Sequence, residues 1–126
     1  MSLLNDRLNR RKEKIQSEQL DKFDGVLFCH VTGASFGSRQ EIIKQIGGST
    51  LLRLDRDRRN EFDFHAVLVM AFVNDEWQEA GFVPSTVNKS VAQSLDAGDS
   101  LKVGLWRKNG GEDGFLYGLS ITISKD

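Results

Sequence analysis

The sequence predicts one α+β domain in which strands outnumber helices. Short apolar segments rich in β-branched and aromatic residues recur along the chain, and glycines or charged turns separate them, which is typical of strands. Two segments with helical spacing interrupt this pattern. The predicted order is strand, helix, three strands, helix and two strands, which is compatible with a small closed or nearly closed barrel. With 126 residues, the chain can bury a core without a metal or a disulfide.

The composition describes a nearly neutral chain, with 17 Lys and Arg residues against 18 Asp and Glu residues. A surface that coats duplex DNA neutralises many phosphates, so this balance argues against such a role. The single cysteine, Cys29, excludes an internal disulfide. The N-terminus is too polar for a signal peptide, so we expect a reducing, cytoplasmic location. No apolar run approaches the ~20 residues of a membrane span, and no membrane partner is expected.

Residues 1–24 are predicted to form a helical extension of a domain that spans residues 25–126. This segment is charged, and its sparse apolar positions form a narrow stripe at Leu4, Leu8, Ile15 and Leu20. One interpretation is a helix that docks on the domain or frays. The other is a helix for self-association or for a protein partner, because so thin a stripe buries little surface on its own.

The first strand is expected at residues 26–32, and Gly33 ends it. A short helix follows, because Ser38 and Glu41 have the spacing of a capping box. In that arrangement the serine hydroxyl accepts a backbone hydrogen bond while the glutamate reaches back to the start of the helix. Gly47–Gly48 is expected to end the helix by adopting the left-handed conformation.

The longest apolar run, residues 66–73, predicts a buried strand, because it is short and rich in β-branched residues. The second strand is expected at residues 49–55 and the third at 65–73, with a charged turn between them. Residues 74–76 resemble a hairpin tip, and residues 77–83 are expected to return as the fourth strand. The predicted core includes Leu54, Val67, Val69, Leu119 and Ile121.

A second helix and a final hairpin complete the domain. Pro84 suits the start of a helix, where its missing N–H costs nothing, and Gly98 is expected to end that helix. Residues 101–105 and 115–123 alternate between apolar and small or polar side chains, which predicts two half-buried strands joined by a loop at residues 108–114. One face of the helix is expected to be buried, at Val87, Val91 and Leu95.

The chain lacks the motifs of common enzyme classes, including Gly-x-Ser-x-Gly, His-Glu-x-x-His, a Walker loop and Cys-x-x-Cys. Cys29 and His30 are neighbours on a predicted strand, so their side chains point to opposite faces and cannot form a nucleophile and base pair. We expect Cys29 to be a small core residue. His30 and His65 have no further ligands at metal-binding spacing. The sequence therefore predicts a non-catalytic domain without a metal or cofactor.

Aromatic residues and arginines gather at predicted strand ends and turns. The set comprises Phe36, Phe62, Phe64 and Phe82, with Arg39, Arg53, Arg56, Arg58 and Arg59. A pocket for single-stranded nucleic acid needs these groups, because bases stack on aromatic rings for ~1–3 kcal/mol each and cations contact phosphates. An alternative remains open on the residues alone: phenylalanine usually lies in the core, and a mixed-charge tract often forms a solvated turn.

Three short motifs follow one another in a fixed order. They read Val31-x-Gly33-x-Ser35-Phe36-x-x-Arg39-Gln40, then Leu54-x-Arg56-Asp57 with Asn60-x-Phe62-Asp63-x-x-Ala66-Val67, and then Ala80-Gly81-Phe82-Val83-Pro84. In order and spacing they resemble the motifs of the HIRAN domain family, over about residues 26–123. The resemblance implies a barrel related to the OB fold. The expected fold is thus α+β and mainly β: a small six-stranded OB-related barrel with two short helices and an N-terminal helix.

The resemblance also implies that the domain binds the 3′-hydroxyl end of single-stranded DNA. In DNA-end-binding members of the family, terminal bases stack on aromatic residues and an aspartate accepts a hydrogen bond from the terminal hydroxyl. The matching positions are Asp63 for the aspartate, Phe62 in place of a tyrosine, Asn60 two residues before it, and Phe36 for an upstream aromatic residue. A carboxylate suits this role because it accepts from a sugar hydroxyl and repels a 3′-phosphate.

Four positions depart from the pattern of those DNA-end binders. Ser35 replaces an arginine, Gly37 a tyrosine, Phe82 a histidine and Ser85 a lysine. Two phosphate-binding cations are therefore missing, and Arg39 and Arg58 are the nearby candidates to replace them. For Asp63 and Asn60 there is also a structural interpretation, in which their side chains hydrogen-bond to the local backbone and fix the turn.

These arguments give eight candidate nucleic-acid-binding residues: Ser35, Phe36, Arg39, Arg58, Asn60, Phe62, Asp63 and Phe82. The expected function is a single-stranded DNA-binding module that recognises 3′-hydroxyl ends and assists DNA repair or replication. The alternative is a non-catalytic protein-interaction or oligomerisation module that assembles through the N-terminal helix. The feature that separates the two is whether Phe36, Phe62 and Phe82 surround one concave surface or are buried.

Overall fold

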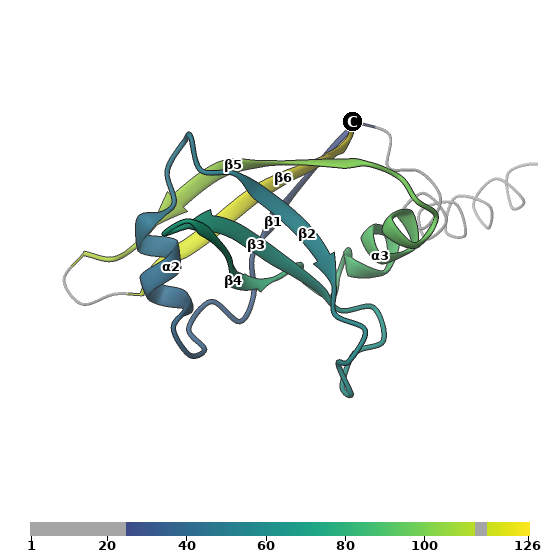
Figure 1. The fold of residues 1–126 in the computed structure, drawn as a ribbon, viewed down its shortest axis with the longest axis horizontal. Helices are drawn as coiled ribbons and strands as arrows, with labels where there is room; N and C mark the ends of the chain where they lie inside the picture. Colours follow the sequence, from purple (N-terminus) through teal and green to yellow (C-terminus); the bar gives the residue numbers. More distant parts are fainter. Residues whose placement is uncertain (1–24, 113–115) are drawn as a thin grey trace, which may run out of the picture.

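The computed structural model describes residues 25–112 and 116–126, and in that part of the chain six strands form two antiparallel sheets (Figure 1). Two short helices, α2 (Arg39–Gln45) and α3 (Asn88–Asp96), lie at opposite ends of the sheets. The fold is therefore mainly β, as the alternating apolar segments predict. The expected helix in residues 1–24 lies outside the described residues, as does part of the last hairpin loop.

The first sheet has the strand order β1-β6-β5. It consists of β1 (Val26–His30), β6 (Gly118–Lys125) and β5 (Leu101–Asn109). The central strand β6 directs Leu119 and Ile121 into the core, because alternate side chains of a strand point to opposite faces. The other face of this sheet points away from the core.

The second sheet has the strand order β2-β3-β4. It consists of β2 (Leu52–Arg56), β3 (Val67–Val73) and β4 (Glu76–Phe82). Asn74 and Asp75 connect β3 to β4 with φ angles of 56° and 64°, the positive values that a two-residue hairpin loop requires at both positions. The predicted hairpin tip is confirmed.

The two sheets meet at the end of β1. The backbone of Thr32 exchanges hydrogen bonds of 2.9 and 2.8 Å with that of Phe82, which follows a bulge in β4. Gly81 permits this approach, because a Cβ there would lie 2.4 Å from the Val31 side chain and 2.5 Å from the Thr32 carbonyl oxygen. The junction places Phe82 beside the loop that follows β1.

The expectation of a closed barrel is wrong for the part of the chain that the structure describes. On the other side of the domain β2 and β5 lie near each other, but no hydrogen-bonded ladder joins them and the described strands stay in two separate sheets. Without that ladder the ring of backbone hydrogen bonds that defines a barrel is incomplete.

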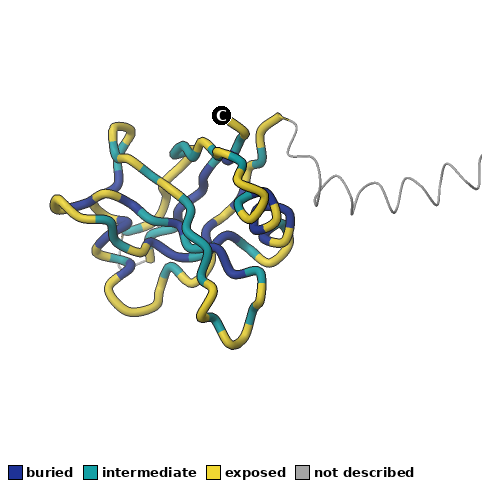
Figure 2. The backbone as a smooth tube through the Cα atoms, turned by 45° about the vertical axis from the view of Figure 1, so that its right-hand side comes forward, coloured by how far each residue is buried: buried dark blue, intermediate teal, exposed yellow. Residues whose placement is uncertain are grey.

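The core fills the space between the sheets, where the buried segments gather (Figure 2). Val67, Val69, Leu119 and Ile121 are buried, as predicted. Leu54 is only half-buried, because β2 is an edge strand of its sheet. The prediction of a buried Leu54 is therefore wrong, although this residue packs against the core.

Helix α2 (Arg39–Gln45) lies where it was predicted, but its ends differ from the prediction. Ser38 occupies the N-cap position without a side-chain capping hydrogen bond, so the capping box does not form. At the other end Ile46 turns to an extended conformation. Neither Gly47 nor Gly48 has a positive φ. The prediction that these glycines end the helix in the left-handed conformation is therefore wrong. The buried Ile43 and the residues around it anchor the helix to the core instead.

Helix α3 (Asn88–Asp96) begins four positions after Pro84. The Pro84 carbonyl accepts hydrogen bonds from the N–H groups of Val87 and Asn88, so the proline forms a turn before the helix and its predicted place at the helix start is wrong. The end is as expected: Gly98 has a φ of 89°. It follows the last turn as the left-handed residue of a C-terminal cap.

Candidate functional site

A pocket of about 870 Å³ opens beside the junction of the two sheets. Four segments line it: the end of β1, the turn that leads into α2, the β2–β3 loop and the connection from β4 to α3. Its volume lies within the range of small-molecule sites. Six of the eight predicted residues line it, namely Phe36, Arg39, Asn60, Phe62, Asp63 and Phe82.

The other two predicted residues do not line this pocket. Ser35 is exposed in the turn before α2. Arg58 turns toward α3, where its Nη2 lies 2.7 Å from Oδ1 of Asp96. The structure therefore does not bring Arg58 to the place of the missing phosphate-binding cation.

The aromatic residues around the pocket are exposed to different extents. Phe62 is 99% exposed and Phe36 is 74% exposed, while Phe82 is half-buried at the junction. A core role is therefore wrong for Phe36 and Phe62. Exposed apolar groups that gather at a concave site are typical of ligand or partner surfaces. All three rings line one concave surface, and none of them lies in the core.

The guanidinium group of Arg39 contacts the rings of both Phe36 and Phe82. Its Nη1 donates to the Gly33 carbonyl oxygen at 2.9 Å, and its Nη2 lies 3.2 Å from a carboxylate oxygen of Glu79. The guanidinium carbon lies 5.4 Å from the centroid of the Phe36 ring and 5.0 Å from that of Phe82, within the range of cation–π contacts. Arg39 thus positions both rings, and Glu79 offsets much of its charge.

Asn60 and Asp63 shape the β2–β3 loop. Oδ1 of Asn60 accepts hydrogen bonds of 2.9 Å from the N–H groups of Phe62 and Asp63. Oδ1 of Asp63 accepts from the N–H of His65 at 2.8 Å. The structural interpretation of both residues, as side chains that fix a turn, is confirmed.

The Asp63 carboxylate can also accept a further hydrogen bond from a ligand. Its Oδ2 accepts one hydrogen bond, from Nδ2 of Asn88 at 2.7 Å. Each carboxylate oxygen has two lone pairs, so a hydroxyl in the pocket can donate to Asp63 without breaking the bonds that hold the turn. The amide of Asn88 fixes the orientation of this carboxylate.

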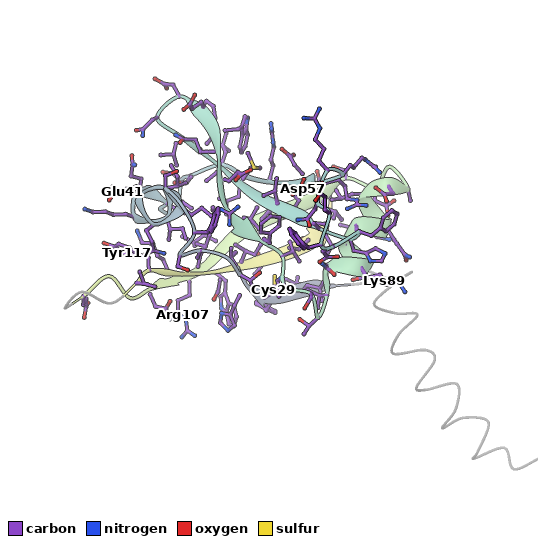
Figure 3. All side chains as sticks on the ribbon, turned by 90° about the horizontal axis from the view of Figure 1, so that it is seen from below. Cys29, Glu41, Asp57, Lys89, Arg107 and Tyr117 are labelled. Atoms are coloured by element: carbon purple, nitrogen blue, oxygen red, sulfur yellow. The ribbon has the colours of Figure 1, made fainter. Side chains whose placement is uncertain are left out.

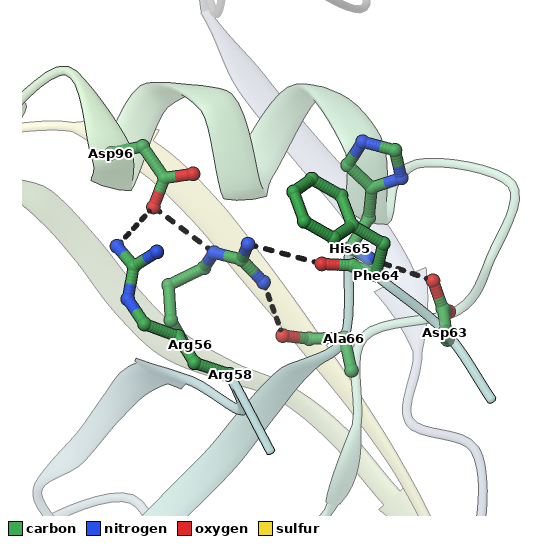
Figure 4. Close-up of polar contacts among 7 residues, drawn as sticks. All are labelled: Arg56, Arg58, Asp63, Phe64, His65, Ala66 and Asp96. Atoms are coloured by element: carbon green, nitrogen blue, oxygen red, sulfur yellow. Dashed lines mark hydrogen bonds and ion pairs between the residues drawn. The ribbon is translucent and has the colours of Figure 1, made fainter. Parts of the chain in front are cut away.

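Arg56 holds the β2–β3 loop in place, a role that was not predicted from the sequence (Figure 4). Its Nη1 and Nη2 donate to the carbonyl oxygens of Ala66 and Phe64 at 2.8 and 3.1 Å. Its Nε lies 3.0 Å from Asp96, and its side chain is only 8% exposed. The alternation of side chains along β2 could have predicted this role, because Arg56 lies two residues after Leu54 and therefore points to the same, inward face of the sheet.

Charged groups are scarce among the residues that line the pocket: Arg39 is the one cation and Asp63 the one carboxylate. Helix α3 begins at its edge, with Asn88 in the lining. The first turn of α3 holds no acidic residue of its own, so the positive end of the helix dipole favours an anion, and the Asp63 carboxylate accepts a hydrogen bond from the side chain of its first residue. Ser85 and Thr86 add hydroxyl groups beside it.

Cys29 and His30 point to opposite faces of β1, as predicted: the cysteine is buried and the histidine exposed. Burial raises the pKa of the Cys29 thiol to about 11, so at neutral pH it stays protonated and a poor nucleophile. Within residues 25–112 and 116–126, no three His, Cys, Asp or Glu side chains cluster closely enough to hold a metal. None of the helices described is long and apolar enough to cross a membrane.

The ion pairs of Asp96 with Arg56 and Arg58 should make the stability of the fold depend on pH in the acid range. The hydrogen bond from Arg56, with a smaller contribution from Arg58, lowers the pKa of Asp96. A carboxylate whose pKa is lower in the folded than in the unfolded state stabilises the fold above the unfolded pKa, and this contribution disappears as the pH falls through the folded value. We therefore expect the free energy of unfolding to fall more between pH ~5 and ~2 in the wild type than in Asp96→Asn. Urea titrations across that range measure it, and identical acid dependence would contradict the assignment.

Comparison with known proteins identifies a similar fold in a solved structure. No protein-family model and no curated protein sequence matches the chain. The structure is similar to the crystal structure of a protein from Lactobacillus plantarum that was determined by a structural genomics consortium. The TM-score is 0.57 at 15% identity, over 79% of this chain and 99% of the other. At this identity the likeness supports the arrangement of strands and helices alone.

Proposed function

We propose that this chain is a HIRAN-like domain that binds single-stranded DNA and receives a 3′-hydroxyl end in the pocket beside the sheet junction. One observation carries the proposal: the exposed rings of Phe36 and Phe62 stand around the same pocket as Phe82 and the Asp63 carboxylate. Solvent-exposed rings offer stacking surfaces to bases of any sequence. The carboxylate offers an acceptor to a sugar hydroxyl.

In this proposal each group has a separate task. Phe62 and Phe36 stack with the last bases, while Asp63 accepts a hydrogen bond from the terminal hydroxyl. The start of α3, together with the hydroxyl groups of Ser85 and Thr86, contacts the phosphate next to the end. The domain performs no chemistry on the strand. Its role is that of an accessory module in DNA repair or replication, which brings a strand end to other proteins.

The test compares two strands that differ only at the 3′ end. A short oligonucleotide with a fluorophore on its 5′ end is titrated by anisotropy, once with a 3′-hydroxyl and once with a 3′-phosphate. The phosphate removes the donor and places negative charge beside Asp63, so we expect binding to weaken by ~2–4 kcal/mol. This corresponds to a dissociation constant about 30 to 1,000 times larger. A modified 5′ end should have little effect.

Three variants separate the tasks. Asp63→Asn should narrow the difference between the two ends, because it removes the repulsion and keeps an acceptor. Phe62→Ala should weaken both strands alike, by ~1–3 kcal/mol, because stacking does not sense the terminus. Phe64→Ala is the matched control: Phe64 is a 79% exposed phenylalanine of the same loop but does not line the pocket, so its loss should change neither affinity.

Equal affinity for the two ends would contradict end recognition. Absence of binding at high micromolar protein in low salt would overturn the DNA-binding proposal as a whole. In that case the protein-interaction alternative, with assembly through residues 1–24, would be favoured.

A further inference from the structure

A second group of aromatic residues lies on the outer face of sheet β1-β6-β5. Phe28 of β1 is 55% exposed and Trp106 of β5 is 47% exposed. Their ring centroids are 4.7 Å apart in an edge-on contact, and the ring of His30 stacks on Trp106 at 6.3 Å. Together they cover Ser120 of the central strand, whose hydroxyl is hydrogen-bonded to Nδ1 of His30. The proposed DNA-end pocket uses none of these residues.

A β-bulge places Trp106 on this face. Leu105 pairs with Ile121 and Arg107 with Ser120, so Trp106 is the extra residue of β5. Bulges redirect side chains and are common near functional sites. Arg107 projects from the same region of the sheet (Figure 3). Its guanidinium carbon lies 5.6 Å from the centroid of the Trp106 ring.

The charge of this sheet differs from that of the chain. Its three strands contain Lys102, Arg107, Lys108 and Lys125 and no Asp or Glu, although the whole chain has a net charge of −1. The Lys108 ammonium donates to two backbone carbonyls, and Lys125 pairs with Asp99. Among the described residues Lys102 and Arg107 are in no ion pair. Flat rings together with exposed cations on one face are complementary to the bases and phosphates of a single strand.

The outer face of β1 leads from this cluster to the pocket. Val26, Phe28 and His30 are exposed at alternate positions while Cys29 between them is buried. Thr32 continues the exposed series and lines the pocket. At about 3.3 Å per residue, Phe28 lies roughly 13 Å along the strand from Thr32. A nucleic-acid strand that ends in the pocket can therefore continue over the cluster.

We propose that the face formed by Phe28, Trp106, Lys102 and Arg107 is a second subsite for single-stranded nucleic acid, which holds the nucleotides on the 5′ side of the bound end. This inference rests on the proposed function, because the pocket fixes where the strand ends. Trp106 and Phe28 stack with bases of the incoming strand. Lys102 and Arg107 contact its phosphates.

The test uses strand length to separate the two sites. Fluorophore-labelled oligothymidylates with a 3′-hydroxyl are prepared at about three and about twelve nucleotides, one below and one within the range of about 4–16 nucleotides that single-strand-binding OB folds cover. The wild type should bind the longer probe more tightly. Trp106→Ala should weaken binding of the longer probe roughly tenfold, as expected for the loss of one stacked base. It should leave binding of the trinucleotide within about twofold, whereas Phe62→Ala should weaken both.

Matched variants control for changes in stability and charge. Phe72→Ala removes a 39% exposed ring from the other sheet and should leave both probes unchanged. The double variant Lys102→Gln/Arg107→Gln should reduce the slope of log K against log salt by about 1.4 for the longer probe, since each phosphate contact to a single strand contributes about 0.7. The slope for the trinucleotide should not change.

A fluorescence measurement keeps the test informative if Trp106→Ala does not fold. The chain has two tryptophans, so Trp77→Phe leaves Trp106 as the single reporter. Addition of the longer probe should quench its emission, and the trinucleotide should not. Absence of quenching by a longer probe that binds would contradict the second subsite.

The remaining outcomes distinguish this inference from the proposed function. If neither probe binds the wild type, both fail. If both probes bind with equal affinity and Trp106→Ala changes neither, the pocket proposal stands and the second subsite is overturned. If Trp106→Ala converts an oligomer to a monomer in sedimentation and leaves binding of the longer probe intact, a second copy of the chain covers this face and the inference is again overturned.

Discussion

Val69→Asp is expected to leave the domain unfolded at neutral pH. Val69 is fully buried in the middle of β3, where it pairs with Leu54 on one side and Gly81 on the other. Val69 belongs to a cluster of buried apolar side chains, which offer a carboxylate no partner. Burying an unpaired charge costs several kcal/mol, against a total stability of about 5–15 kcal/mol for a domain of this kind. Far-UV circular dichroism with thermal melting measures the effect.

The control for this prediction lies three positions away on the same strand. Phe72 points to the outer face of its sheet and is 39% exposed. Phe72→Asp loses the contact with the Trp77 ring, whose centroid is 5.3 Å away, but the new carboxylate stays in water. It should keep a cooperative transition. If Val69→Asp melted within a few degrees of the wild type, the assignment of the core would be wrong.

The strands could be predicted from the sequence because the apolar run or alternation that marks each strand lies within that strand's own residues. The apolar run that became β3 and the Asn74-Asp75 hairpin needed no information from elsewhere in the chain. The closure of the barrel was different. It depends on whether β2 pairs with β5, and these strands are far apart in sequence and belong to different sheets. No residue pattern within either strand encodes that pairing.

Two predictions about how the helices begin, the capping box at Ser38 and the helix start at Pro84, were wrong for a related reason. Ser38 and Pro84 both have side chains that suit the start of a helix, and both lie in the turn that precedes one. Pro84 follows directly from the sheet junction, where Phe82 pairs with Thr32. We infer that the path of the chain out of this junction fixes where α3 begins, and that this constraint outweighs the weaker local preference of proline.

Six of the eight predicted site residues line one pocket, because the motif residues lie at the ends of strands that the fold brings together. The exposure of Phe36 and Phe62 could not be predicted, since an apolar residue in a loop is compatible with either environment. Arg58 lies outside the pocket because its partner, Asp96, is on a helix that follows much later in the chain. The role of Arg56 was open to prediction from strand parity, since it shares a face with Leu52 and Leu54.

Arg56→Met is the second prediction with a large expected effect. Methionine keeps much of the apolar volume of the arginine stem but leaves the carbonyl of Phe64 without this donor, and Ala66 with one donor fewer. It also removes the Nε contact with Asp96 from a side chain that is 8% exposed. Hydrogen bonds from a charged donor contribute about 1.5–3 kcal/mol, and several are lost together. We expect a loss of about 2–4 kcal/mol in the free energy of unfolding, measured by urea titration.

Arg58→Met provides a matched control, because Arg58 contacts the same Asp96 oxygen from a side chain that is 67% exposed. An exposed ion pair contributes about 0–1 kcal/mol, so this variant should be close to the wild type in stability. The two variants should also differ in binding. Loosening the loop that carries Asn60, Phe62 and Asp63 should reduce the preference for a 3′-hydroxyl over a 3′-phosphate in Arg56→Met and leave it intact in Arg58→Met. Equal losses of stability in the two variants would show that Arg56 acts only through its ion pair with Asp96, and that its hydrogen bonds to the loop backbone do not hold the pocket together.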